Sequence, residues 1–214
     1  LNIHDEVIAN KRKTYVLISF FIIFIAALGY MLGIILGAPI IGLIIAVLGA
    51  LVYTGIMYAQ GSNLILKTTG AKEATKKEYP HLFNTVEGLA IAAGIPPPKC
   101  YVIEDTALNA FATGTKPENA SITVTTGLLK KLNRQELEGV IAHEMSHIKN
   151  YDIRIMLITV VLVGVTILLS DFILRSYLWG GHGNRDRNIN QVTIVLIVAA
   201  FLLAIFAPII AELV

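Results

Sequence analysis

The chain has 214 residues, of which 55% are hydrophobic and 15% are charged, and its mean hydropathy of +0.70 is far above that of a water-soluble protein. A formal net charge of only +2 excludes a strongly basic nucleic-acid-binding protein, so we expect no nucleic-acid partner. Length and composition together favour a small soluble domain combined with membrane-spanning helices.

The N-terminal part of the chain predicts a membrane hairpin. Residues 1–14 are largely polar and are expected to form a cytoplasmic N-terminus. Residues 15–59 contain no charged side chain, and a helix needs about 20 apolar residues to cross a bilayer. We therefore expect two transmembrane helices, near 15–36 and 40–59, with a turn at Gly37. The glycines that would allow these helices to approach closely are Gly29, Gly33, Gly37, Gly42, Gly49 and Gly55.

Residues 60–152 have an ordinary soluble composition and predict an α+β domain inserted between hydrophobic segments. A helix is expected from Tyr79–Pro80 to about Ala93, because Gly94 follows it. The single cysteine, Cys100, cannot form an internal disulfide and is expected to be a small buried apolar residue. The predicted strands are Cys100–Glu104, Asn109–Thr113 and Ala120–Thr126, and residues 127–132 are expected to bridge to the next helix.

The stretch His143-Glu144-Met145-Ser146-His147 has the pattern H-E-x-x-H. On a helix, residues four apart lie on the same face, so His143 and His147 can bind one zinc ion together. Glu144 can then act as the general base that takes a proton from water. Asn133 and Glu136 predict a capping box at the start of this helix, and Leu137, Val140, Ile141 and Ile148 predict its apolar stripe. The alternative is a buried helix whose two histidines are satisfied by hydrogen bonds.

Side chains of the kinds that can bind zinc also occur at His81, Asp152, His182 and Glu212. Asp152, five residues past the second histidine, is expected to be a hydrogen-bond partner of a ligand or a helix terminator rather than a ligand. His81 and His182 are expected to be surface or structural residues. Glu212 lies close to the C-terminus and is not expected to bind the metal.

Residues 153–214 predict two further hydrophobic helices, which brings the expected number of membrane spans to about four. The first, Ile155–Ser170, covers about 24 Å by helical rise and needs Arg154 to reach the interface. A helix packed on the soluble domain remains the alternative for it. The second is Asn188–Ala211. Lysines and arginines concentrate on the side of the soluble insert, which places that domain in the cytoplasm.

The chain resembles the HtpX family of membrane-embedded zinc metalloproteases of prokaryotes. The likeness covers nearly the whole chain and includes Asn109-Ala110-Phe111-Ala112-Thr113-Gly114 and His143–His147. It implies an α-helical integral membrane protein with a zincin-like metalloprotease domain, one zinc ion per chain and a location in the cytoplasmic membrane. It also implies a third zinc ligand, a Glu in an E-x-x-A-D-like motif after the fourth span. We expect that Glu beyond Val214, so that the chain stops short of the rest of the catalytic domain, and the sequence does not indicate whether the chain is active by itself.

A protease must hold its substrate as an extended chain beside the metal, and an exposed strand edge does this through backbone hydrogen bonds. We expect Ala120–Thr126 to be that edge, and Asn109–Thr113 to form the other wall. The expected substrate-binding residues are Asn109, Ala110, Phe111, Ala112, Ile122, Thr123, Val124 and Thr125.

The expected function is a zinc endopeptidase that cleaves misfolded or damaged membrane proteins in quality control and the response to stress. Its partners would be unfolded substrates and the lipid bilayer, and the sequence does not indicate an oligomeric state. A non-catalytic membrane scaffold or chaperone-like binder that retains the metal motif is the alternative. A transporter is disfavoured because the predicted spans carry no central ionisable residue.

Overall fold

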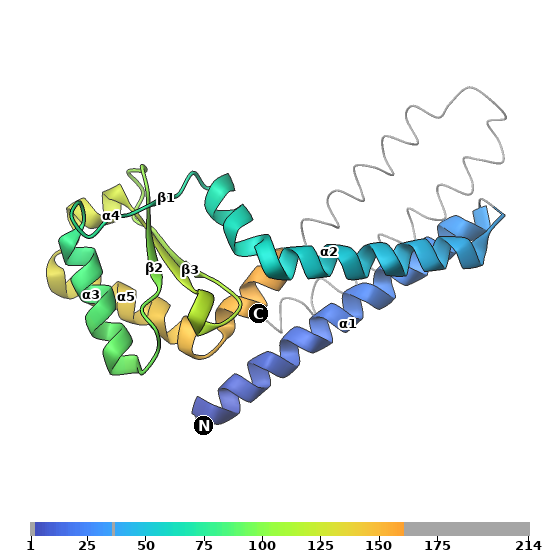
Figure 1. Ribbon diagram of the computed structural model, residues 1–214, viewed down its shortest axis with the longest axis horizontal. Coiled ribbons are helices and arrows are strands. Elements are labelled where there is room, and N and C mark those ends of the chain that lie inside the picture. The colour runs from blue at the N-terminus through green and yellow to red at the C-terminus, as the bar shows by residue number, and fades with distance from the viewer. Residues whose placement is uncertain (1–2, 36, 161–214) are drawn as a thin grey trace. The chain divides into compact units, whose positions relative to one another are not determined.

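The computed structural model describes residues 3–35 and 37–160 of the chain (Figure 1). The chain divides into two compact units. One unit contains residues 58–157 together with the first 14 residues, and the described part of the other contains residues 15–57 and the few residues after Leu157. The described elements, in chain order, are α1 (Ile3–Ile35), α2 (Pro39–Thr68), β1 (Lys72–Glu73), α3 (Pro80–Ala93), β2 (Lys99–Ile103), β3 (Ala110–Thr113), η1 (Pro117–Asn119), β4 (Ser121–Thr125), α4 (Thr126–Lys131) and α5 (Arg134–Lys149).

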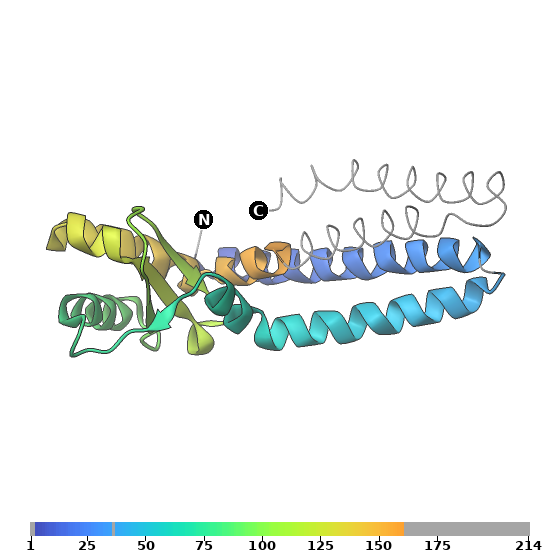
Figure 2. The same ribbon diagram turned by 90° about the horizontal axis from the view of Figure 1, so that it is seen from above.

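Helices α1 and α2 form the predicted apolar hairpin, and both are long and apolar enough to cross a membrane (Figure 2). The turn between them lies at Gly37, as the sequence predicts. Gly37 has a positive φ of 77°. Both helices extend beyond the predicted ends: α1 begins at Ile3 and α2 continues to Thr68. Many large apolar side chains of α2 are exposed, which is the pattern of a helix that faces lipid.

Three of the predicted glycines bring the two helices of the hairpin together. A Cβ atom added at Gly29 would lie 2.1 Å from the Cβ of Ala46, and one added at Gly42 would lie 2.4 Å from the carbonyl oxygen of Gly29. Gly33 is in a similar position against the start of α2. Among the described residues, no atom lies within 4 Å of a Cβ added at Gly37, Gly49 or Gly55, so a contribution of these three to helix packing stays a prediction.

The unit that contains residues 58–157 has a mixed four-stranded sheet with the order β1-β2-β4-β3. Strand β4 pairs in parallel with β2 and antiparallel with β3, while β1 pairs antiparallel with β2. The predicted strands agree with β2, β3 and β4 to within one or two residues. The two-residue strand β1 and the short helix α4 were not predicted as such.

Helices α3 and α5 pack against each other, and α5 also contacts β3 (Figure 1). Helix α3 starts with Pro80 and ends at Gly94, which adopts the left-handed conformation and donates to Ile91 O, as predicted. Its buried residues Leu82, Val86 and Ala90 recur at helical spacing. The core between these helices and the sheet also includes the predicted buried Cys100.

The position of β4 corrects one prediction. The sequence predicts Ala120–Thr126 as an exposed edge, but β4 is central and all five of its residues are buried. Its small polar side chains are buried together with its β-branched ones. Thr125 Oγ1, for example, donates to Ala107 O over 2.6 Å and accepts from Leu128 N at the start of α4. Residues Ile122–Thr125 therefore cannot offer a free edge to a substrate.

Two predicted C-terminal spans lie largely outside the described residues. Residues 152–160, at the start of the predicted span Ile155–Ser170, are helical. The predicted span Asn188–Ala211 lies wholly outside the described part of the chain.

Candidate metal centre

Two histidines lie one turn apart near the C-terminal end of α5. This helix begins with the predicted capping box: the Asn133 side chain accepts from Glu136 N, and the Glu136 carboxylate accepts from Asn133 N over 2.8 Å. It is held against the core by four residues at helical spacing, Leu137, Ile141, Met145 and Ile148. Of the predicted stripe, Val140 is only half-buried, and Met145 takes part instead. His143 is exposed and His147 is half-buried, so the pair faces away from the core.

The two imidazole rings converge on one point. Their centroids are 4.7 Å apart, with an angle of 84° between the ring planes, and the two Nε2 atoms are 3.2 Å apart. Two nitrogen ligands of a tetrahedral zinc, each about 2.0–2.1 Å from the metal, lie roughly 3.3 Å from each other. The pair therefore fits two positions in the coordination sphere of zinc.

Asp152 lies directly behind the second histidine. Its Oδ2 atom is 2.9 Å from Nδ1 of His147. Because an ionised carboxylate can only accept, Nδ1 carries the proton, and Nε2 of the neutral ring keeps its lone pair for a metal. The turn that brings Asp152 back to the helix contains Tyr151, which has a positive φ of 63°. The sequence expectation for Asp152, a partner of a ligand rather than a ligand, agrees with this geometry.

Glu144 lies between the histidines in sequence and is half-buried beside β3. The backbone N–H of Ala112 donates to its carboxylate. Burial raises the pKa of the Glu144 carboxyl above its ordinary value, while His147, His143 and the Ala112 N–H act in the opposite direction. The carboxyl therefore has a higher proton affinity than an exposed Glu, as a proton-transfer group requires.

Strand β3 has one side that is free of strand pairing within the described residues. Opposite residues of an antiparallel pair alternate between hydrogen-bonded and non-bonded positions. The bond of 3.0 Å from Thr125 N to Asn109 O fixes the phase of this alternation. Ala110 and Ala112 consequently direct their backbone groups away from β4, which agrees with the bond from Ala112 to Glu144.

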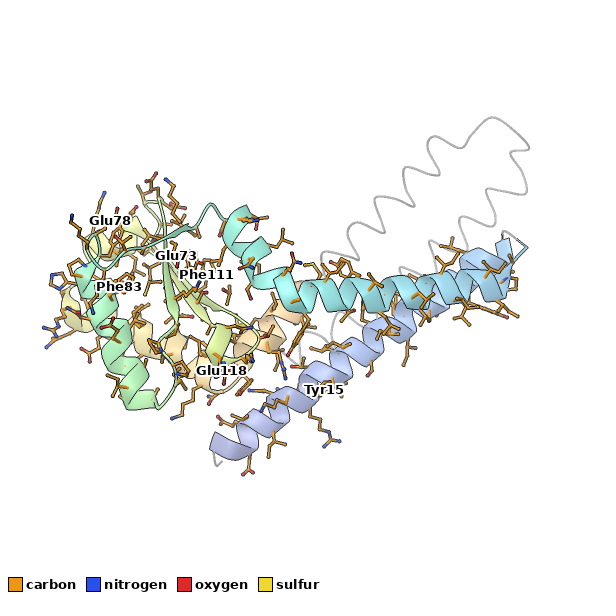
Figure 3. The ribbon with its side chains drawn as sticks, in the orientation of Figure 1. Tyr15, Glu73, Glu78, Phe83, Phe111 and Glu118 are labelled. Atoms are coloured by element: carbon orange, nitrogen blue, oxygen red, sulfur yellow. The ribbon has the colours of Figure 1, made fainter. Side chains whose placement is uncertain are left out.

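The structure thus divides the predicted substrate-binding residues into two groups. Ala110, Phe111 and Ala112 lie on β3, where Figure 3 labels Phe111, and Ala112 lies beside the Glu144 carboxylate. Asn109 is exposed immediately before the strand. The second group, Ile122–Thr125, is buried in the central strand β4, which has no open edge for a substrate.

One residue of the site was missed by the sequence reasoning. Asn10, on α1, donates through Nδ2 to Oδ1 of Asp152 and to the carbonyl oxygen of Asn150 over 3.0 Å. An asparagine in a polar segment before an apolar run carries no local signal of such a contact, because its partner is 142 positions away.

Comparison with known proteins agrees with this geometry. The sequence profile of Peptidase family M48 matches residues 76–211. The chain belongs to peptidase family M48. A protein named Protease HtpX homolog from Dictyoglomus turgidum is 45% identical over 212 residues, or 98% of this M48 chain and 67% of that relative. Relatives with the same name from Listeria monocytogenes and Streptococcus agalactiae are 44% and 42% identical, over 97% and 99% of this chain and 71% and 72% of their own lengths.

Membership confirms the resemblance to the HtpX family and makes this M48 chain a metallopeptidase that is associated with membranes. Within residues 3–35 and 37–160, no three His, Cys, Asp or Glu side chains form a group that could hold a metal ion. His81 is exposed at the start of α3 and is not part of the site. His182 and Glu212 lie outside the described residues, and the Glu expected beyond Val214 as the third ligand stays a prediction.

Proposed function

We propose that this M48 protein is a zinc-dependent endopeptidase of a prokaryotic cytoplasmic membrane. The observation that supports the proposal most strongly is the pair of Nε2 atoms 3.2 Å apart, with Glu144 between their residues and Asp152 behind one of them. A zinc ion held there, one per chain, would supply a Lewis acid that polarises a peptide carbonyl and acidifies water.

The side chains of the site have distinct roles in this proposal. His143 and His147 bind the metal through Nε2, and Asp152 keeps the His147 ring in the orientation that this requires. Glu144 accepts a proton from the attacking water and passes it to the nitrogen of the departing peptide. Its raised pKa helps it to hold that proton between the two steps.

The substrate is proposed to lie along the free edge of β3. Ala110 presents its N–H and C=O there and Ala112 its C=O, while the Ala112 N–H is bonded to the Glu144 carboxylate that transfers the proton. Asn109, exposed at the start of the strand, is placed to bond to the same backbone. An edge that recognises main chain favours broad specificity for unfolded segments, which suits the removal of misfolded or damaged membrane proteins under stress.

The proposed arrangement in the membrane follows the charge pattern of the sequence. Residues 15–59 form a transmembrane hairpin, residues 60–152 form the zincin-like catalytic domain on the cytoplasmic side, and residues 153–214 contain two further spans. The polar N-terminus, residues 1–14, lies on the cytoplasmic side as well, because lysines and arginines are retained there.

Glu144→Gln tests the proposal in the full-length protein. The amide can still accept from Ala112 N–H but cannot take a proton, so kcat/KM for an unfolded fluorogenic peptide should fall by about 10²- to 10⁴-fold with zinc content unchanged. Glu138→Gln, an exposed change on the same helix, is the matched control and should leave the rate unaltered. Cleavage by Glu144→Gln at the parent rate would refute the role of Glu144. A parent protein that binds the peptide and zinc without cleaving it would instead support the scaffold alternative.

A further inference from the structure

The N-terminal end of α1 contacts the turn that follows the active-site helix. Asn10 is half-buried, and its amide nitrogen donates to two acceptors on that turn, the Asn150 carbonyl and one carboxylate oxygen of Asp152. An asparagine amide has two N–H groups, so both donors are used. The orientation of this side chain is therefore determined by the turn that it contacts.

These contacts continue to the candidate metal ligand. The oxygen of Asp152 that is not bonded to Asn10 accepts from Nδ1 of His147 over 2.9 Å. With both oxygens engaged, the carboxylate cannot rotate without losing a hydrogen bond to a half-buried partner. Asn10 thus restricts the orientation of the Asp152 carboxylate, and this carboxylate sets the tautomer and orientation of the His147 ring.

A second contact from α1 supports the same turn. Lys11 Nζ lies 4.2 Å from the centre of the Tyr151 ring, within the range of a cation–π interaction. Tyr151 has a left-handed backbone conformation, which is unfavourable for a residue with a side chain and persists only where neighbours hold it. Two successive residues of α1 therefore hold the backbone turn that positions Asp152.

We propose that Asn10 is a positioning residue of the metal centre, which acts through Asp152 on His147. This inference rests on the proposed zinc site. The N-terminal segment thus has a role besides leading into the first apolar helix, since it provides the outermost support of a metal ligand. Replacement of a partner behind a metal ligand typically weakens metal binding about 10- to 100-fold. Asn10 is one hydrogen bond further from the metal than Asp152, so we expect a smaller loss of zinc affinity, about three- to tenfold.

The test measures the zinc affinity of the full chain in detergent by competition with a chelating dye. Asn10→Ala should weaken zinc binding about three- to tenfold, and Asn10→Leu, which keeps the side-chain volume without its donors, should do the same. Asn84→Ala, an exposed asparagine on α3, is the matched control and should leave the affinity unchanged. The rise in the unfolding midpoint on zinc addition should shrink in the Asn10 variants, because metal that binds more weakly stabilises less.

A double-mutant cycle separates positioning from simple packing. In an Asp152→Ala background Asn10 has no carboxylate to orient, so Asn10→Ala should then change the zinc affinity less than about twofold. An equal loss in both backgrounds, or parental affinity in both Asn10 variants, would overturn the inference and leave the proposed function standing. A full-length parent protein, including the part expected beyond Val214, that binds no zinc would overturn the proposed function, and this inference with it.

Discussion

A proline at Ala110 tests whether the free edge of β3 binds substrate. The hydrogen-bond phase of β3 directs the Ala110 N–H away from β4, so proline removes a donor that the sheet does not use. Extended backbone on an edge strand also tolerates the fixed φ of proline. The fold should therefore be retained while one bond to an extended substrate is lost.

The size of the effect follows from that single bond. One neutral hydrogen bond contributes about 0.5–1.5 kcal/mol, which corresponds to a rise in KM of about two- to tenfold. The proline ring also occupies the position from which the N–H would reach the substrate, so the observed rise should not fall below this range. Zinc content and kcat should change little, because Ala110 does not contact His143, Glu144 or His147 through the bonds described above.

The matched control is Thr113→Pro on the same strand. Thr113 lies in a hydrogen-bonded position opposite Ser121, so this change leaves a buried backbone group unpaired and should lower the free energy of unfolding by about 1–3 kcal/mol. Steady-state kinetics on an unfolded peptide and thermal unfolding measure the two effects. Unchanged KM in Ala110→Pro, or unfolding of that variant to the same extent as Thr113→Pro, would refute the assignment of the edge.

Two further predictions concern the unit of residues 58–157: its stability to unfolding and the reactivity of its cysteine. Gly127→Ala places a Cβ 2.2 Å from the carbonyl oxygen of Thr106, so it should lower the free energy of unfolding by about 1–3 kcal/mol in denaturant titrations. Gly88→Ala, where a Cβ meets open space on α3, should be neutral or stabilising by up to about 1 kcal/mol; equal losses would contradict the clash. Burial raises the pKa of the Cys100 thiol to about 11, so iodoacetamide at pH 8 should label it slowly in the fold and rapidly in denaturant. Because the neutral thiol is favoured in the fold, its contribution to stability is present below about pH 9 and is lost as the pH rises towards 11; fast labelling of the folded chain would contradict the burial.

Features that depend on neighbouring residues were predictable. The capping box of Asn133 and Glu136, the end of α3 at Gly94 and the convergence of His143 and His147 each depend on residues within one or two turns of a helix. The contact between Asp152 and His147 is also local, because the two residues are five positions apart. Short-range geometry of this kind can be read directly from sequence spacing.

Features that depend on distant pairing were not predictable. The alternation in Ser121–Thr125 agrees equally with an edge strand and with a central strand whose small polar side chains are buried. Which of the two holds depends on β2 and β3, and no residue of β4 specifies those partners. The contact of Asn10 was missed for the same reason, since its acceptor is 142 positions along the chain.

That separation also sets an order in time for the newly made protein. Synthesis at roughly 5–20 residues per second means that Asp152 follows Asn10 by about 7–28 s. During this interval Asn10 has been synthesised, but the turn that it contacts has not. The support for His147 can be completed only after nearly all of the described chain has been translated. A nascent chain therefore cannot complete the hydrogen bonds from Asn10 through Asp152 to His147 before residue 152 has been synthesised.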